Sequence, residues 1–328
     1  MKIIAYGVRV DEVAYFEQWQ RETGNELTMR SDLLTEATVH EARGYDGINC
    51  LQTTPYAAGV FEAMATYGIR FLTIRNVGTD NIDLAAARQA GVRIANTPAY
   101  SPNAIAEFAV TLTLRLLRRL GEVEARLHAD DYAQATTFIG RELAHQTVGV
   151  IGAGRIGQAA IRLFAGFGAR VLVYDPHPQP DPSLACTYVD WETLLAQSDI
   201  IDLHIPGTAA NTHIIDAAAL AKMKPDALVI NTARGNLIDT EALLTALQSG
   251  RLGGAGIDTF ENESQALVTL DATGHFHDPL WDALLALDNV VLTPHVAYYT
   301  QTAVHNMVFY SLAALEDLVV RGTTEHEV

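Results

Sequence analysis

The sequence predicts an α/β protein with two domains, each built on a doubly wound parallel β-sheet. The chain has 328 residues, 49% of them hydrophobic. A chain of this length is too long for one ordinary hydrophobic core. Short apolar segments alternate with longer segments of helical periodicity along almost the whole chain. A turn with two prolines at residues 97–102 interrupts this alternation, so we interpret it as the passage from one domain to the next.

The first series of elements occupies the N-terminal hundred residues. Short apolar segments typical of buried strands lie at residues 2–8, 47–52, 70–75 and 92–96. Helical patterns lie among them at residues 13–23, 57–67 and 84–90. Strands that alternate with helices form parallel sheets. We therefore predict a flavodoxin-like domain.

The segment after the two prolines begins a helix. Ser101 suits an N-cap, and Pro102 suits the first helical position, where its missing N–H leaves no bond unmade. Residues 104–120 then form one long, largely apolar pattern. We expect a single helix buried on several sides.

The second series lies between residues 147 and 292. Its six strand patterns are residues 147–151, 170–174, 200–204, 228–231, 254–258 and 290–292. A last helical pattern, residues 300–320, comes after these strands, and we expect it to return to the first domain. The predicted domains are therefore 1–101 with 299–328, and 102–298.

The charge of the chain excludes several classes of protein. Lysine and arginine number 22 and acidic residues 39, so the formal net charge is −17. Such a chain repels nucleic-acid backbones and anionic lipid, and we expect neither as a partner. The N-terminus lacks a signal-peptide pattern, and charges interrupt every apolar run that approaches membrane-spanning length. We expect a cytoplasmic protein without a membrane segment.

The two cysteines, Cys50 and Cys186, are far apart and lack the spacing of metal ligands. We interpret both as buried apolar side chains. Two thiols make no disulfide framework, which fits a reducing compartment. We therefore predict no metal site.

A glycine-rich turn carries the clearest ligand signature. Residues 152–157 read Gly-Ala-Gly-Arg-Ile-Gly, with a strand pattern before them and a helical pattern after them. Gly152 permits a tight turn, Gly154 lets the backbone approach a diphosphate, and Gly157 lets helix and strand pack closely. The helix N-terminus presents N–H groups and partial positive charge to that diphosphate. The context predicts a Rossmann dinucleotide-binding domain in which Arg155 and Ile156 also contact the cofactor.

The strand after this helix ends in Asp175, 18 residues after Gly157. A carboxylate at this place accepts hydrogen bonds from the adenosine ribose and repels a 2′-phosphate. The predicted cofactor is therefore NAD (NADH) and not NADP. His177, in a proline-rich segment, leaves some tolerance of NADP open.

Three polar residues follow strands of the second series: Arg234, Glu263 and His295. An arginine fork binds both oxygens of a carboxylate. A histidine protonates a developing alkoxide near neutral pH, and a carboxylate beside it favours the protonated imidazole. This set suits the reduction of a 2-keto acid by hydride transfer. Glu261 competes with Glu263 for the carboxylate role, and spacing alone leaves both open.

The chain resembles the D-isomer-specific 2-hydroxyacid dehydrogenases over essentially its whole length. The resemblance rests on the glycine-rich turn, Thr232-Ala233-Arg234-Gly235, Asp258 with a glutamate five residues later, and Pro294-His295. It extends to residues 1–7, 47–49, 51–56, 75–81 and 294–299. The resemblance implies a D product, Glu263 in preference to Glu261, and a homodimer joined through the dinucleotide-binding domain.

The resemblance also implies roles that spacing does not reveal. Val77 and Gly78 would offer backbone N–H groups to the substrate carboxylate, and Tyr100 and Tyr298 would line the substrate pocket. Asp258 would lie beside the nicotinamide amide. Four further residues would lie near the cofactor: His204, Pro206, Thr232 and Ala233.

Leu51 bears on the choice of substrate. Lactate-specific relatives carry a tyrosine at this position, and leucine leaves room for a branched or aromatic group. We expect 2-ketoisocaproate or phenylpyruvate to be preferred to pyruvate, with some breadth, because one methylene discriminates by only ~1–3 kcal/mol. Two alternatives remain: a D-lactate dehydrogenase that acts mainly on pyruvate, and an NAD-sensing binding protein without turnover.

Overall fold

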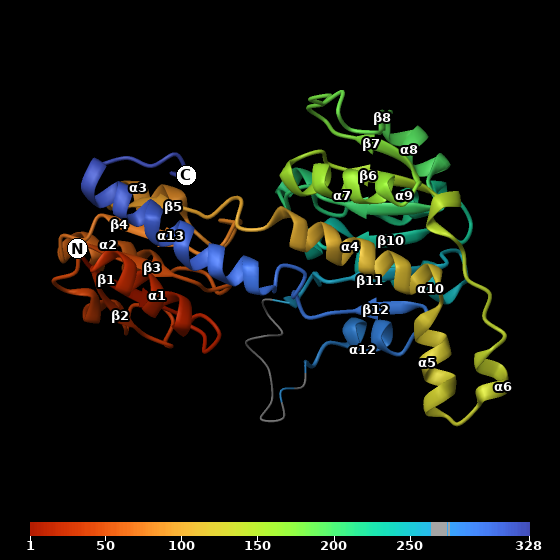
Figure 1. The fold of residues 1–328 in the computed structure, drawn as a ribbon, viewed down its shortest axis with the longest axis horizontal. Coiled ribbons are helices and arrows are strands. Elements are labelled where there is room, and N and C mark those ends of the chain that lie inside the picture. Colours follow the sequence, from red (N-terminus) through yellow and green to blue (C-terminus); the bar gives the residue numbers. More distant parts are fainter. Residues whose placement is uncertain (264–273, 275) are drawn as a thin grey trace. The chain divides into compact units, whose positions relative to one another are not determined.

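The computed structural model describes residues 1–263, 274 and 276–328. The chain forms two compact units, which are Met1–Ser101 with Tyr299–Val328 (unit 1) and Pro102–Tyr298 (unit 2). Each unit contains one parallel sheet with a hydrophobic core on both faces (Figure 1). The predicted α/β class with two doubly wound sheets is therefore confirmed.

The sheet of unit 1 has the strand order β2-β1-β3-β4-β5. Its strands are β1 (Lys2–Tyr6), β2 (Glu26–Met29), β3 (Gly47–Cys50), β4 (Phe71–Ile74) and β5 (Arg93–Ala95). This is the flavodoxin order, so the flavodoxin-like prediction is confirmed. The sequence pattern misses the edge strand β2 because Leu27 is its one buried residue, and a single apolar side chain makes no strand pattern.

Helices cover both faces of this sheet. They are α1 (Val13–Thr23), the 3₁₀ turn η1 (Val39–Ala42), α2 (Ala58–Thr66), α3 (Leu84–Gln89) and α13 (Gln301–Arg321). α13 packs on α1, β3 and β4, and its Leu315 lies in the same apolar cluster as Ile3 and Phe16. A Cβ added at Gly47 would lie 2.7 Å from Leu315, so β3 and α13 approach closely. The C-terminal helix thus completes the core of the N-terminal unit.

Among the described residues, α13 is the one helix long and apolar enough to cross a membrane by length and composition. This differs from the expectation that charges interrupt every such run. Half of its apolar window is buried, and its contacts are those of a core helix.

The sheet of unit 2 has the strand order β12-β11-β10-β9-β6-β7-β8. Its strands are β6 (Thr147–Ile151), β7 (Arg170–Tyr174), β8 (Thr187–Tyr188), β9 (Ile200–Leu203), β10 (Leu228–Asn231), β11 (Gly254–Ile257) and β12 (Val290–Leu292). From β8 to β11 this is the Rossmann order, with β12 added at the far edge. The two-residue β8 is the strand that the sequence pattern misses. Because all pairs are parallel, the carboxyl ends of the strands share one edge.

Two groups of helices enclose this sheet. On one face lie α4 (Pro102–Leu117) and α7 (Arg155–Gly166), which pack on each other. On the other lie α8 (Trp191–Gln197), α9 (Ala217–Lys222), α10 (Thr240–Gln248) and α12 (Pro279–Leu285). Short 3₁₀ turns are η2 (Leu143–His145), η3 (Ala209–Asn211) and η4 (Gly235–Leu237).

The predicted single helix over residues 104–120 is wrong at its C-terminal end. α4 stops at Leu117, and Arg119 adopts a left-handed φ of 53° that no α-helix accommodates. A separate helix, α5 (Leu120–His128), follows, and then α6 (Tyr132–Ala135). No residue of α5 is buried, whereas α4 packs on α7, β10 and β11.

The two cysteines differ in their surroundings. Cys50 is buried, as predicted, and burial raises the pKa of its thiol to about 11. Cys186 is only half-buried, so the prediction of a buried side chain is wrong there.

Candidate active site

The three glycines of the turn after β6 have different steric environments. Gly152 has φ 95°, and a Cβ there would lie 2.6 Å from the His204 carbonyl oxygen. A Cβ at Gly157 would lie 2.0 Å from the Gly152 carbonyl oxygen, so the start of α7 lies directly on the turn. A Cβ at Gly154 would meet no atom of the described residues within 4 Å, apart from its chain neighbours. Gly152 and Gly157 are thus required by the fold, whereas Gly154 leaves exposed backbone that a ligand can approach.

The N-terminus of α7 has the features of an anion-binding site. Gly154 is its N-cap, and no side chain of the described residues caps it. Arg155 and Ile156 form its first turn, which leaves their N–H groups outside the helical hydrogen-bond ladder. Unpaired N–H groups and exposed glycine backbone together fit a diphosphate.

Asp175 lies beside this turn at the end of β7. Its Oδ2 accepts a hydrogen bond from the Ala153 N–H and its Oδ1 accepts one from the His177 N–H, both at 2.8 Å. Each oxygen retains a second lone pair, so the oriented carboxylate can still accept hydrogen bonds from ribose hydroxyls.

Two further predicted cofactor residues follow strands β9 and β10. The His204 side chain is buried, and its Nε2 lies 2.7 Å from Asp202 Oδ2. Thr232, after β10, has a buried Oγ1 without a hydrogen-bond partner among the described residues. A buried, unpartnered hydroxyl is the kind of group that a bound cofactor satisfies. Pro206 is exposed after β9, and Ala233 is half-buried beside Thr232.

Arg234 is held from both sides. Its carbonyl oxygen accepts a hydrogen bond from Asn231 Nδ2 at 2.8 Å, and its Nη1 donates to the Ala233 carbonyl oxygen at 2.7 Å. A Cβ added at Gly207 would lie 2.9 Å from Arg234 Cβ and Cγ, so the arginine stem lies directly on this glycine. The guanidinium is thereby anchored beside the carboxyl ends of β9 and β10.

His295 and Glu263 form a hydrogen-bonded pair, with His295 Nδ1 2.7 Å from Glu263 Oε1. Burial lowers the pKa of His295, but the hydrogen bond and charge of Glu263, together with the charge of Asp258, outweigh burial and raise it. Arg234 is close enough to lower the same pKa, though by less. The structure therefore brings the three predicted catalytic side chains together in unit 2.

The second glutamate of this loop faces a different histidine. Glu261 Oε1 hydrogen-bonds to Nε2 of His213, and its Oε2 accepts a hydrogen bond from Thr240 Oγ1 at 2.8 Å. The alternative that spacing left open is thus resolved geometrically, because Glu263 is the carboxylate that contacts His295.

Asp258 fixes the backbone that carries His295. Its Oδ1 accepts hydrogen bonds from Thr293 Oγ1 at 2.5 Å and the Val296 N–H at 2.9 Å, and its Oδ2 accepts one from the Ala297 N–H at 2.8 Å. His295 itself has φ 56°, a left-handed conformation that costs energy outside glycine. The buried carboxylate holds both flanks of this turn.

The other residues predicted to bind substrate belong mainly to unit 1. Leu51 and Val77 follow the carboxyl ends of the neighbouring strands β3 and β4, and Leu51 is partly exposed. Asn96 Nδ2 donates to the Val77 carbonyl oxygen at 2.6 Å, which orients the Val77–Gly78 peptide. Tyr100 is buried in unit 1. In unit 2, the Tyr298 ring packs edge-on against His295 at 6.3 Å between centroids.

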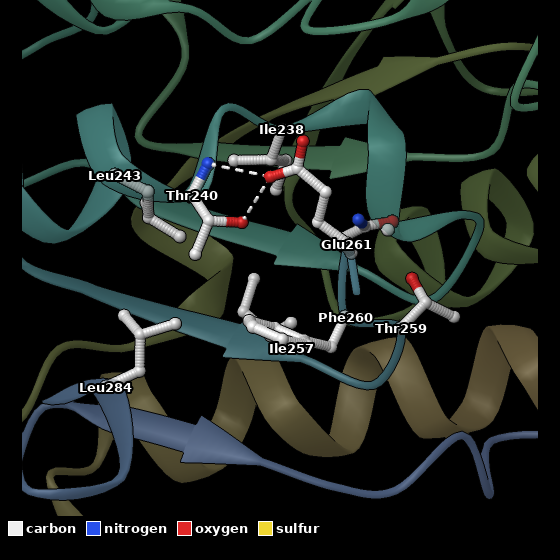
Figure 2. Close-up of a pocket in the computed structure, with 10 residues that line it drawn as sticks. Ile238, Thr240, Leu243, Ile257, Thr259, Phe260, Glu261 and Leu284 are labelled. Carbon is white, nitrogen blue, oxygen red and sulfur yellow. Dashed lines mark hydrogen bonds between the residues drawn. The ribbon is translucent and has the colours of Figure 1, made fainter. Parts of the chain in front are cut away.

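A small cavity near this site is not the substrate pocket. It lies under the loop after β11 and has a volume of about 10 Å³, which is room for about one water molecule. Figure 2 shows Glu261 and Phe260 on one side of it and Leu284 on another. Its lining includes Asn231, Gly235, Thr240, Thr259, Phe260 and Glu261.

Comparison with known proteins identifies the family. Residues 110–297 match the family described as D-isomer specific 2-hydroxyacid dehydrogenase, NAD binding domain. The chain is 61% identical to a D-2-hydroxyacid dehydrogenase (NAD+) of Lacticaseibacillus paracasei, over all of this chain and 98% of that protein. The chain belongs to the D-isomer-specific 2-hydroxyacid dehydrogenases.

Two further comparisons place it within the family. A solved structure of D-2-hydroxyisocaproate dehydrogenase matches with a TM-score of 0.96 and 61% identity, covering 100% of this chain and 99% of that one. A D-lactate dehydrogenase of Lactiplantibacillus plantarum is 43% identical, over 100% of this chain and 99% of that protein. This dehydrogenase is therefore an NAD-dependent oxidoreductase that acts on the CH–OH group of 2-hydroxy acids, as predicted.

The side chains that support this site are what the sequence reasoning misses. Asn231 and Gly207 hold Arg234, Thr293 completes the contacts of Asp258, and His213 holds Glu261. Asn231 left a readable signal, since a buried polar residue at the end of an apolar strand needs a partner. The others are ordinary loop residues in the sequence.

Proposed function

We propose that this dehydrogenase reduces 2-keto acids with branched or aromatic side chains, such as 2-ketoisocaproate and phenylpyruvate, to the D-2-hydroxy acids. The observation that carries the proposal is Leu51, which is partly exposed at the carboxyl end of β3. A leucine there offers apolar surface and no hydroxyl. The higher identity to the D-2-hydroxyacid dehydrogenase, 61% against 43% for the D-lactate dehydrogenase, supports the same choice.

The glycine-rich turn and Asp175 would hold NADH, which would supply the hydride when bound. Arg234 binds the substrate carboxylate with its guanidinium fork. His295 Nε2 donates a proton to the carbonyl oxygen while Nδ1 keeps its hydrogen bond to Glu263. In the oxidation of the hydroxy acid, neutral His295 accepts that proton back.

The raised pKa of His295 matches both directions of the reaction. Glu263 and Asp258 stabilise the imidazolium, so the proton donor is populated at higher pH than in a free imidazole. Reduction is then lost as pH rises through this pKa, and oxidation is gained over the same interval.

Steady-state kinetics with a panel of 2-keto acids tests the proposal. We expect kcat/KM for 2-ketoisocaproate to exceed that for pyruvate, and Leu51→Tyr to lower this ratio by about tenfold or more. His295→Gln should reduce kcat by ~10²–10⁴. A wild-type preference for pyruvate would favour the D-lactate dehydrogenase alternative. If the protein binds NADH but none of the keto acids supports NADH oxidation, the alternative of an NAD-sensing binding protein would be favoured.

We further propose that the protein is a cytoplasmic homodimer that uses the segment from α5 to residue 139. Apolar side chains are exposed along this segment, including Tyr132 at 74% and Ile139 at 86%. In Figure 1, α5 and α6 lie side by side beyond the end of α4. A second copy is the expected occupant because exposed apolar patches of this kind mark interfaces. Sedimentation equilibrium should give a dimer that Leu127→Asp with Ile139→Asp converts to a monomer.

A further inference from the structure

The loop after β11 supplies the glutamate of a second histidine–glutamate pair, because Glu261 lies two residues before Glu263. Glu261 hydrogen-bonds to His213 through Oε1, while its Oε2 accepts bonds from Thr240 Oγ1 at 2.8 Å and from the Thr240 N–H at 3.4 Å. Figure 2 shows the Glu261 carboxylate reaching Thr240 at the start of α10. One side chain thus ties three separate segments of unit 2 together.

His213 is itself a fixed anchor. Its backbone adopts a left-handed φ of 52°, and its N–H donates to the Asn236 carbonyl oxygen at 2.8 Å. Asn236 Nδ2 in turn donates to the Gly207 carbonyl oxygen at 3.2 Å. The anchor therefore belongs to the same stretch of chain that supports Arg234.

The backbone of the loop has little freedom next to Glu261. A Cβ added at Gly235 would lie 2.2 Å from the Phe260 carbonyl and 2.5 Å from the Glu261 nitrogen, so this peptide lies directly on the residue after Arg234. The Phe260 ring is buried and packs edge-on against Phe276 and Trp281.

The position of Glu263 depends on this same peptide. The Glu263 N–H donates to the Phe260 carbonyl oxygen at 3.2 Å, and Glu263 Oε2 accepts a bond from the Phe260 N–H at 3.3 Å. The other carboxylate oxygen of Glu263 contacts His295. A shift of the peptide at residues 260–261 would therefore move the carboxylate that faces His295.

We propose that His213 and Glu261 are positioning residues that hold the Glu263 carboxylate against His295. The proposal rests on the function given above, in which His295 transfers the proton. Neither residue needs to touch substrate or cofactor for this role, because both act through the loop.

Acidic residues around His213 favour its protonated form, which pairs with the Glu261 carboxylate. The hydrogen bond that His213 donates to Glu261 raises the pKa of His213 against the effect of burial, and the charges of Glu261, Asp239 and Asp216 add to the rise. The imidazolium–carboxylate pair therefore persists to higher pH than a free histidine would allow, and it weakens as pH rises through the raised pKa.

The test is the acid limb of the pH profile of kcat/KM for oxidation of a D-2-hydroxy acid. This limb reports the pKa of His295, which must be neutral to accept the proton. Glu261→Gln and His213→Leu should each move it to lower pH by about 0.5–1 unit, a part of the one to two units that a charged hydrogen bond is worth. The double variant should move it no further than the larger single change.

Three controls separate positioning from general damage. His213→Gln keeps an amide donor near the place of Nε2, so its limb should lie closer to wild type than that of His213→Leu. Thr240→Val removes the hydroxyl hydrogen bond to Glu261 Oε2, leaves the backbone N–H bond in place, and should shift the limb in the same direction. Glu142→Gln and His145→Gln disrupt an exposed pair, 81% and 79% accessible and 3.7 Å apart, and should leave the limb unchanged.

The possible outcomes separate failure of the proposed function from failure of the positioning role. A wild-type protein without turnover on any 2-keto acid overturns the proposed function itself. A wild-type limb retained in folded Glu261→Gln and His213→Leu overturns only the positioning role. Activity lost equally at all pH values, with the limb in place, also rejects it.

Discussion

Replacing Gly154 by alanine tests whether the diphosphate lies where the exposed backbone of the glycine-rich turn suggests. Gly154 has φ −68° and ψ −170°, which is extended backbone that alanine adopts without strain. In the part of the chain that the structure describes, the new Cβ meets no atom within 4 Å beyond its chain neighbours. The methyl group would therefore occupy space that only a ligand contests, and we expect the variant to fold normally.

Gly157→Ala is the matched control, because its Cβ would lie 2.0 Å from the Gly152 carbonyl oxygen. Relieving such a clash costs about 1–3 kcal/mol, which lowers the Tm of a domain of this size by about 2–12 °C. For Gly154→Ala we expect the free energy of unfolding to change by less than about 1 kcal/mol. The loss of one charged hydrogen bond to the diphosphate, about 1.5–3 kcal/mol, would raise the Kd for NADH by about 10–150-fold.

Calorimetric titration with NADH and a thermal melt of each variant give both quantities. Gly154→Ala should weaken NADH binding with little change in Tm, whereas Gly157→Ala should lower Tm. Wild-type affinity for NADH in Gly154→Ala would mean that the diphosphate lies elsewhere. A Tm that falls as far as in Gly157→Ala would mean that the space above Gly154 is not open.

Three other substitutions test the remaining parts of the site. Glu263→Gln removes the anion that raises the pKa of His295, so the alkaline limb for keto-acid reduction and the acid limb for hydroxy-acid oxidation should both move to lower pH by about one to two units; unchanged limbs would exclude Glu263 as the partner. Asp258→Asn leaves at least one backbone N–H facing an amide, so urea unfolding should show a loss of about 1–3 kcal/mol, together with a lower kcat; equal stability would mean that the turn does not need the carboxylate. Arg234→Lys keeps the charge without the fork, so KM for the keto acid should rise more than about tenfold while the Kd for NADH stays unchanged; a rise in both would assign Arg234 to the cofactor.

The strongly patterned elements were readable from the sequence and the weakly patterned ones were not. The helices α1 and α13 lie within one residue of their predicted bounds, because each has a long periodic pattern and a glycine C-cap in the left-handed conformation. The edge strands β2 and β8 are short and half-exposed, so they lack the apolar run that marks their neighbours. The break at Arg119 is a single left-handed residue, and nothing in the flanking pattern marks it.

The candidate site was likewise only partly predictable from the sequence. Arg234 and His295 were candidates because their residue types and their places after strands have a chemical meaning, whereas the preference for Glu263 over Glu261 came from the family resemblance. The contacts that hold these residues were not predictable, because hydrogen bonds such as Glu261 to His213 join residues 48 positions apart in the chain. Motif spacing indicates the chemistry of one segment of the sequence. The contacts that hold the site residues in place depend on how several loops pack together.

The interrupted course of unit 1 separates the order in which the chain is made from the order in which its cores can close. Residues 1–101 are synthesised first, yet Val308, Leu312 and Leu315 of the last helix complete the cluster on Ile3 and Phe16. Unit 2 is one continuous segment and is finished earlier. Until α13 has been made, the part of the unit 1 sheet face that α13 covers stays exposed in the nascent chain, a state that invites chaperones or aggregation. A chain that stopped before α13 would leave this part of the face without its cover while sparing unit 2.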